Sequence, residues 1–296
     1  MQYDPHHCTL CPRRCGADRT KSSGICGAGD AILAARAALH LWEEPPISGT
    51  NGAGTVFFSG CPLHCRFCQN AVISQTPYGK AISPARLCEI FLELQAQGAH
   101  NIELVTAGHF LPYVIPALTL AKPHLHIPVV YNSGGYELTD ALRELDGLVD
   151  IYLPDFKFFD PETARNYANA PDYPEVAEEA LTEMLRQVGT PVFSGEIMQR
   201  GVIVRHLVLP GARHESIALL HHLAQKFGTD AFWLSLMSQY TPMRHDPDFP
   251  ALNRRVTKME YNAVADTAAV LGFHGFTQDK SSAESRYTPD FHLQGL

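Results

Sequence analysis

The chain has 296 residues, 45% of them hydrophobic and 18% charged, so a sizeable core is available and wholesale disorder is not expected. The net charge of −8 disfavours a nucleic-acid-binding protein, which would normally carry a basic stripe. No apolar run of about 18 residues indicates a membrane span, and the first residues contain no apolar signal region. Eight cysteines in tight groups therefore indicate metal binding in a reducing cytoplasm rather than disulfide bonds.

The first 50 residues are rich in Gly, Arg and Pro and show little apolar periodicity. Four cysteines with the spacing C-x2-C-x3-C-x10-C lie in this segment, namely Cys8, Cys11, Cys15 and Cys26. Four thiolates can close a tetrahedral zinc site or hold an iron–sulfur cluster, and the sequence does not choose between them. Free or disulfide-paired thiols are the alternative. We predict a Cys-rich metal-binding extension over residues 1–50, with a short strand or helix at 31–35 and a loop at 42–46.

A second group of cysteines directly follows the apolar run at 54–59, which predicts a buried strand. Cys61, Cys65 and Cys68 have the spacing C-x3-C-x2-C. Three thiolates on one short loop can hold three irons of a 4Fe–4S cluster and leave the fourth iron open to a small molecule. The alternatives are a zinc knuckle that borrows a ligand such as His64, or chance clustering of buried thiols.

From residue 54 onward, predicted strands and helices alternate. Five more strands are predicted at 101–106, 127–132, 148–153, 202–209 and 231–237. Helices are predicted at 83–98, 139–145, from 160, and at 174–188, 214–227 and 257–271. Six strands separated by helices imply an α/β fold with a parallel sheet and right-handed crossovers.

Polar residues fall at the carboxyl ends of these strands, where parallel α/β barrels bind their ligands. They are Thr106, Gly108 and His109 after the second strand, Asn132 and Ser133 after the third, Asp155 and Lys157 after the fourth, Arg205 inside the fifth, and Gln239 after the sixth. Such positions otherwise hold apolar or turn residues, so we expect a binding site at this edge of the sheet.

The strand, the three-cysteine loop and Phe67 resemble the signature of radical S-adenosylmethionine (SAM) enzymes. Three further motifs resemble the pyruvate formate-lyase activating enzyme-like branch: CTLCPRRC at 8–15, VFFSGC at 56–61 and DFK at 155–157. Within that branch, the chain is most similar to members assigned as activating enzymes by similarity alone. The resemblance spans residues 8–291. It implies a partial (β/α)6 TIM-like barrel, open on one side.

The resemblance also implies a division of the chain into three parts. The Cys-rich extension (1–50) precedes the radical SAM barrel (51–271), and a tail (272–296) packs on the barrel. The tail contains RYTPDF at 286–291, which is similar to the family's own tail.

In the family, a Thr-Gly-Gly-Glu segment meets the methionine ammonium of SAM, which chelates the open iron. The matching stretch here is Thr106-Ala107-Gly108-His109, and His109 cannot serve as an anionic acceptor, so a hydrogen-bonded loop histidine is its alternative role. Asn132 and Ser133 match an Asp-Thr pair. Asparagine at the Asp position puts a monovalent cation there in doubt.

Asp155 and Lys157 match the family's Asp-x-Lys. The resemblance assigns them to the sulfonium or ribose and to the carboxylate of SAM, with a surface ion pair as the alternative. Arg205 is expected to bind the SAM carboxylate with its guanidinium fork, or else to pair with Asp150 or Asp155. Phe67 would pack near adenine, although core packing explains it nearly as well.

The implied reaction starts with one electron from a donor such as flavodoxin or ferredoxin. The reduced cluster cleaves SAM to methionine and a 5′-deoxyadenosyl radical, which removes hydrogen from a substrate over the barrel mouth. The branch resemblance suggests a glycine Cα in a partner enzyme, and another peptide or a small molecule is the alternative. A non-catalytic iron–sulfur or zinc protein would need neither a missing fourth cysteine nor polar strand ends. No catalytic residue and no substrate is identified by the sequence.

Overall fold

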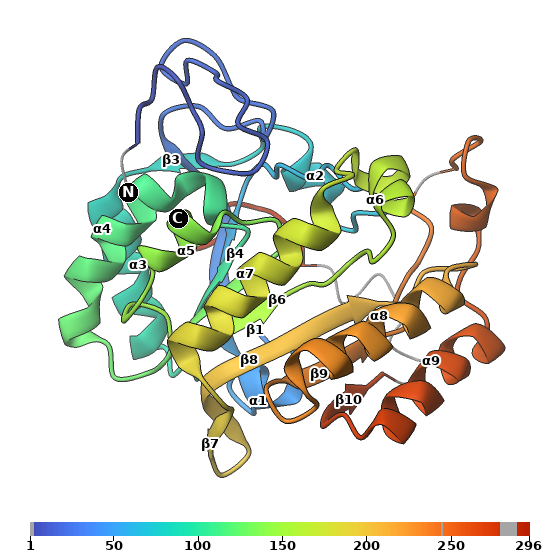
Figure 1. Ribbon diagram of the computed structural model, residues 1–296. Helices are drawn as coiled ribbons and strands as arrows, with labels where there is room; N and C mark the ends of the chain where they lie inside the picture. The colour runs from blue at the N-terminus through green and yellow to red at the C-terminus, as the bar shows by residue number, and fades with distance from the viewer. Residues whose placement is uncertain (1–2, 244, 279–288) are drawn as a thin grey trace.

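The computed structural model describes residues 3–243, 245–278 and 289–296. An open sheet forms its centre (Figure 1). Six strands run parallel side by side, namely β2 (Ala53–Phe58), β4 (Ile102–Val105), β5 (Val129–Ser133), β6 (Ile151–Pro154), β8 (Ile197–Leu207) and β9 (Trp233–Met237). The six parallel strands expected from the sequence are therefore confirmed.

Short strands extend the sheet at both edges. On one side, β10 (Gly275–Thr277) runs parallel to β9. On the other side, β1 (Ile32–His40) runs antiparallel to β2, and β3 (Lys80–Ile82) runs antiparallel to β1. The hairpin strand β7 (Val192–Ser194) pairs only with β8 in the described part of the chain. The edge strands β3 and β10 do not pair with each other within the described residues, so the barrel stays open.

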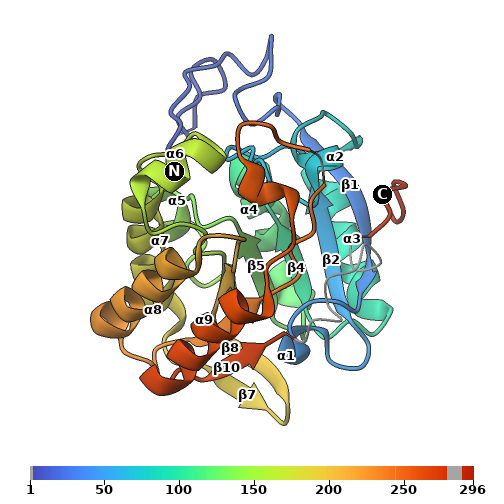
Figure 2. The ribbon, with the colours of Figure 1, turned by 90° about the vertical axis from the view of Figure 1, so that its right-hand side faces the viewer.

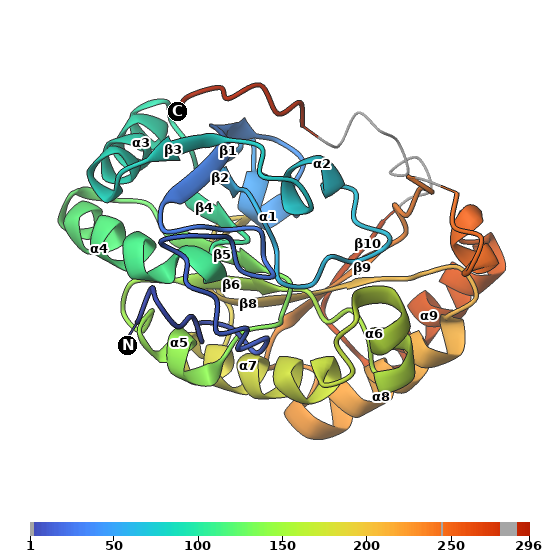
Figure 3. The ribbon, with the colours of Figure 1, turned by 90° about the horizontal axis from the view of Figure 1, so that it is seen from above.

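Helices surround the outer face of the sheet, as the view from above shows (Figure 3). They are α3 (Pro84–Ala96), α4 (Leu111–Ala121), α5 (Thr139–Arg143), α6 (Pro161–Ala168), α7 (Tyr173–Val188), α8 (Arg213–Phe227) and α9 (Lys258–Leu271). Shorter turns are α2 (Ala71–Ser74) and the 3-10 helices η1 (Gly108–Phe110), η2 (Lys122–His124) and η3 (Pro250–Asn253). None of the helices in the described part of the chain has the length and apolar character that crossing a membrane requires.

Side-chain caps set the starts of three of these helices. The Ser83 side chain accepts a hydrogen bond from the Arg86 amide at the start of α3, and Asp160 does the same for α6. Thr257 begins α9 with a reciprocal capping box. The helix α4 was not predicted from the sequence, because it contains an internal proline, Pro116, and is apolar on nearly all sides.

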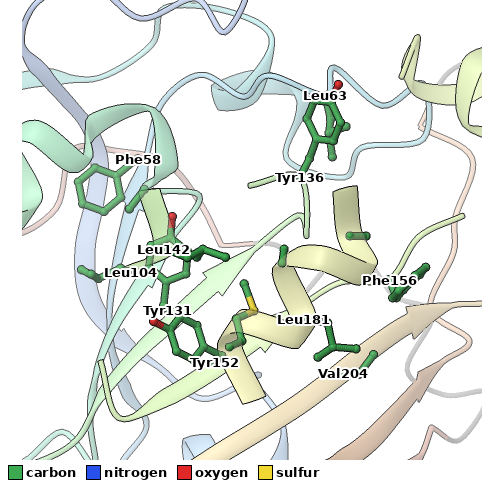
Figure 4. Packing of buried hydrophobic residues seen from close by; sticks show 14 of the residues in the cluster. Phe58, Leu63, Leu104, Tyr131, Tyr136, Leu142, Tyr152, Phe156, Leu181 and Val204 are labelled. Atoms are coloured by element: carbon green, nitrogen blue, oxygen red, sulfur yellow. The ribbon is translucent and has the colours of Figure 1, made fainter. Parts of the chain in front are cut away.

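The side chains of the strands alternate between two apolar layers. Phe58, Leu104, Tyr131, Tyr152 and Val204 point outward and pack under the helices (Figure 4). A smaller buried cluster fills one end of the barrel interior, and it contains Ile47, Ala53, Val130, Ile151, Leu153, Met198 and Ile203. The barrel is therefore closed by side chains at the amino ends of its strands.

Ile47 belongs to a helix that the sequence did not predict. Residues 42–46 were expected to be a loop, but α1 (Pro45–Ser48) begins at Pro45. Proline is well tolerated in the first helical turn, where its missing amide proton has no partner to lose. This correction matters for the site, since α1 closes the barrel and places the two residues before it, Glu43 and Glu44, in the interior.

The two ends of the chain lie on different parts of the barrel. Residues 3–31 of the predicted extension form loops above the carboxyl ends of the strands, at the top of Figure 1, whereas its residues 32–40 form β1 of the sheet. The last residues run beside β1, where the Gln294 carbonyl accepts a hydrogen bond from the Ala37 amide at 2.8 Å. Figures 2 and 3 show this terminal segment next to β1. Of the tail motif at 286–291, residues 286–288 lie outside the described part of the chain.

Candidate active site

A cavity of about 620 Å³ opens at the carboxyl ends of the parallel strands and extends into the barrel. Phe67 and the three cysteines of the C-x3-C-x2-C loop line it. The predicted polar residues that also line it are Thr106, Asn132, Ser133, Asp155, Lys157, Arg205 and Gln239. Residues from all six parallel strands, or from the loops that follow them, thus meet at one cavity.

The three-cysteine loop is held in place by its backbone. It follows β2, whose six residues are all buried, and starts at Gly60 with φ of +89°. Cys61, Cys65 and Cys68 are free thiols. His64, which the zinc alternative would need as a ligand, does not line the cavity, and its Nε2 lies 2.8 Å from the Ile25 carbonyl oxygen.

The thiols of this loop are compatible with an iron–sulfur cluster. Burial raises the pKa of Cys61 to about 11 and also raises that of Cys65, so positive iron would be needed to hold them as thiolates. Among the described residues, no three His, Cys, Asp or Glu side chains surround one metal ion. A 4Fe–4S cluster does not require this, because each cysteine binds a different iron.

Arg205 is the centre of the polar network in the cavity. Its Nε donates to Asp155 Oδ1 at 2.9 Å, its Nη2 to Asn132 Oδ1 at 2.6 Å, and its Nη1 to Glu43 Oε2 at 3.2 Å. The ion pair with Asp155 that the sequence allowed is therefore present, whereas Asp150 pairs with Lys122. One guanidinium joins β5, β8, the end of β6 and the segment before α1.

Asp155 and Lys157 form a buried ion pair rather than a surface one. Their side chains are only 14% and 19% exposed, and Lys157 Nζ contacts Asp155 Oδ2. Burial disfavours the charged carboxylate, but Arg205 and Lys157 outweigh it and lower the pKa of Asp155. The Lys157 ammonium also lowers the pKa of the Cys65 thiol and so opposes the increase that burial causes. The network therefore reaches from the barrel interior to the cysteine loop.

Gly108 and His109 do not line the cavity. His109 is buried behind the loop, where its Nε2 lies 2.8 Å from the Ser59 carbonyl oxygen, and burial lowers its pKa to about 4. Gly108 packs so closely on Glu137 that a Cβ would lie 2.4 Å from a carboxylate oxygen. Thr106 does face the cavity, with φ of +59°, which is a strained conformation for a β-branched residue.

Phe67 contacts both the cavity and the hydrophobic core. Its ring lines the cavity and also packs edge-on against Phe158, with 5.8 Å between the ring centroids. The two roles considered from the sequence, an apolar wall for a ligand and core packing, are thus compatible in one side chain.

Three acidic residues in the barrel interior were missed by sequence reasoning. Glu43 and Glu44 line the cavity, and Glu103 lies beside it, accepting hydrogen bonds from Thr55 and Asn132, each at 2.7 Å. Burial and the neighbouring Glu43 carboxylate raise the pKa of Glu103 to about 8. For Glu103, the only sequence feature that could have indicated a role in the site was its position as a charged residue inside a predicted buried strand.

The cysteines of the extension lie together next to the three-cysteine loop. Electrostatic interactions link Cys11 to Cys8 and Cys26, and Cys26 to Cys15. The Cys26 carbonyl accepts a hydrogen bond from the Cys61 amide at 3.0 Å. Further donors fasten the extension to the barrel: Arg13 Nε donates to the Pro62 carbonyl at 2.8 Å, and Arg19 Nη1 to the His109 carbonyl at 2.7 Å.

Comparison with known proteins identifies the family. Residues 55–223, more than half of the chain, match the Radical SAM superfamily, and the chain belongs to it. Membership implies a 4Fe–4S cluster and SAM as cofactors. An uncharacterized protein of Methanocaldococcus jannaschii is 28% identical over 270 residues, which cover 88% of this chain and 74% of that protein.

Among solved structures, a radical SAM methyltransferase from Sphaerobacter thermophilus is similar with a TM-score of 0.52 and 13% identity. The match covers 76% of this chain and 66% of the methyltransferase, slightly less than two thirds of its length. At this identity the likeness shows the fold alone, and it agrees with the open parallel barrel described above.

Gly60→Ala is expected to separate the extension from the cysteine loop. A Cβ at Gly60 would lie 2.3 Å from the Cys26 carbonyl oxygen, so we expect a loss of about 3 kcal/mol or more in the free energy of unfolding. Gly27→Ala is the matched control, because Gly27 has φ of +79° but nothing lies within 4 Å of its Cβ position. It should lose only about 1–2 kcal/mol. Urea unfolding and limited proteolysis of residues 3–31 measure both effects, and equal losses in the two variants would contradict the docking contact.

Glu103→Gln is expected to change how stability depends on pH. Because the folded-state pKa of Glu103 is raised to about 8, its contribution to stability is complete at low pH and is lost as the pH rises through that value. The variant should therefore lose less stability between pH 6 and pH 9 than the wild type, by up to about 1.4 kcal/mol per pH unit. Urea unfolding of the metal-free protein across this range tests it, with the exposed Glu89→Gln as control. Identical slopes in all three proteins would be the contrary result.

Proposed function

We propose that Cys61, Cys65 and Cys68 hold the 4Fe–4S cluster at which SAM is cleaved reductively, so that the 5′-deoxyadenosyl radical removes hydrogen from a substrate in the same cavity. The observation that carries this proposal is that the three thiols and the buried network of Asp155, Lys157 and Arg205 line one cavity. A loop with three cysteines leaves one iron without a protein ligand, which is what a reactive rather than a storage cluster needs.

The side chains of this chain supply binding, orientation and protection from water. Lys157 is a buried cation next to Cys65 and suits the SAM carboxylate, and Asp155 accepts from the ribose hydroxyls or faces the sulfonium. Phe67 offers an apolar wall for adenine. Arg205 orients Asp155 and Asn132 through its hydrogen bonds, and it acts on SAM through them.

The remaining predicted residues complete the site in this proposal. Thr106 presents its backbone to the amino group of SAM, and Gly108 and His109 support that turn from behind. Ser133 and Gln239 place polar groups on the cavity wall.

The finer assignment is to the pyruvate formate-lyase activating enzyme-like branch. It is supported by the motifs at residues 8–15 and 56–61. The branch suggests a glycine Cα in a partner enzyme as the substrate, and another peptide or a small molecule is the alternative. Flavodoxin or ferredoxin in the cytoplasm would supply the electron. A non-catalytic iron–sulfur or zinc protein is the competing class, and it is disfavoured because such a protein has no use for a large polar cavity next to its cysteines.

We also propose that Cys8, Cys11, Cys15 and Cys26 bind a second metal group. Three of these thiols are buried, and the Cβ position of Gly24 lies 3.3 Å from Cys15 Sγ and 3.7 Å from Cys26 Sγ. Four thiolates can hold either an iron–sulfur cluster or a tetrahedral zinc ion. The metal would order a segment that has little core of its own and that contacts the three-cysteine loop.

Cys65→Ala should abolish the formation of 5′-deoxyadenosine and leave the fold largely intact. The wild type, reconstituted anaerobically with iron and sulfide and reduced with dithionite, is expected to form 5′-deoxyadenosine from SAM without added substrate. Chromatography of the nucleoside is the measurement, and Cys88→Ala, which changes a half-buried thiol on α3, is the control that should retain activity. A Cys65→Ala protein with wild-type turnover would refute the assignment.

Replacing Cys61, Cys65 and Cys68 together by alanine should leave metal at the extension. We expect about four irons, or about one zinc, per chain to remain, and an added Cys11→Ala should remove most of it. Elemental analysis after reconstitution gives both counts and identifies the metal. A triple variant that binds no metal would show that the four extension cysteines are free thiols.

A further inference from the structure

The floor of the cavity is acidic and lies deep in the barrel. Glu43 and Glu44 directly precede α1, whose Ile47 packs among the buried side chains at the amino ends of the strands. Both glutamates line the cavity. Ser235 of β9 also lines it, and its side chain forms a hydrogen bond with the Glu44 side chain. The three-cysteine loop lines the same cavity from the carboxyl ends of the strands.

A chain of charged contacts connects the floor to the cysteine loop. Arg205 forms hydrogen bonds with both Glu43 and Asp155. Asp155 forms an ion pair with Lys157, whose charge interacts electrostatically with Cys65. The floor is therefore separated from the proposed SAM site by the Arg205–Asp155 pair. A molecule in the cavity can contact the floor with one end and face the SAM site with the other.

The network holds more acidic groups than cations. The four carboxyl groups in it are Glu43, Glu44, Glu103 and Asp155. Electrostatic attraction to Arg205 lowers the pKa of each of the four, and attraction to Lys157 lowers the pKa of Asp155 further. Burial, together with the neighbouring carboxylates, raises the pKa values of Glu43 and Glu44. With four carboxyl groups against two cations, the ionised network is short of positive charge, which a cationic ligand would supply.

One oxygen on the floor is unpartnered. Glu44 is only 8% exposed, and its Oε2 has no hydrogen-bond partner among the described residues. Glu43 Oε1 lies 3.8 Å from His40 Nε2, and burial lowers the pKa of that histidine to about 4, so it is neutral. A buried carboxylate oxygen without a donor is costly, and native structures seldom leave one without a reason.

We propose that Glu43 and Glu44 recognise the ammonium group of a small-molecule substrate that is bound in the barrel interior. An alkylammonium supplies the missing charge and the missing donors together. The floor lies inside the barrel, so a slender molecule can reach it and a folded partner protein cannot. This inference rests on the proposed function, and it names a small amine rather than a protein glycine as the hydrogen donor.

The test compares Glu44→Gln, which keeps the shape and removes the charge, with Glu137→Gln. Glu137 is the matched control because it is also buried, with its pKa raised to about 8, but it does not line the cavity. The probe is 1,4-diaminobutane, with 1,4-butanediol as its uncharged analogue, and calorimetry measures binding to the reconstituted protein in the presence of SAM.

We expect the diamine to bind the wild type and Glu137→Gln and the diol to bind neither. Glu44→Gln should weaken diamine binding by about tenfold or more, as the loss of a charged hydrogen bond predicts, while SAM affinity stays unchanged. Equal binding of diamine and diol, or no binding of the diamine to the wild type, overturns the inference. A loss of SAM affinity in Glu44→Gln overturns it too, because the floor would then belong to the SAM site.

The proposed function is checked in the same samples. Dithionite-driven formation of 5′-deoxyadenosine from SAM does not depend on the amine, so it should persist in both variants even if the diamine does not bind. Its absence from the wild type would instead refute the proposed function.

Discussion

The arrangement of the barrel interior depends on one buried cation. The Arg205 guanidinium uses three of its nitrogens to hold Asp155, Asn132 and Glu43, which come from distant parts of the chain. Carboxylates in an apolar barrel are stable only when such a partner is close, because their burial is otherwise very unfavourable. The same contacts keep Asp155 charged next to Lys157 and fix the polar side chains at the carboxyl ends of the strands. Removing this cation would leave several buried acids without compensation.

The extension and the barrel form a single unit around the cysteine loop. A backbone hydrogen bond from Cys61 to Cys26, together with side-chain hydrogen bonds from Arg13 and Arg19, joins residues far apart in the sequence. The loop is therefore supported on one side by β2 and on the other by the extension. A metal group at the extension cysteines would stiffen the segment on which the proposed SAM cluster depends, which gives these cysteines a role without any part in the reaction.

Much of the barrel was predictable from local patterns. The six parallel strands and most of the outer helices follow from apolar runs and from caps such as Ser83 and Asp160. The helices α1 and α4 did not, because prolines in them normally indicate a loop or a break, and tertiary packing overrides that preference at Ile47 and in α4. Most of the predicted polar residues line the cavity, whereas Gly108 and His109 belong to the 3-10 helix η1 and lie behind it.

The sequence by itself determined the superfamily, since three cysteines with the C-x3-C-x2-C spacing after a strand are local features of one segment. It also determined that polar groups would gather at the carboxyl ends, because parallel strands bring those ends to one edge. Only the tertiary structure decided which carboxyl groups share Arg205, that the extension docks on the cysteine loop, and that Glu43 and Glu44 form the cavity floor. These contacts join residues distant in sequence, and no local pattern specifies which of them the folded barrel brings within hydrogen-bond distance.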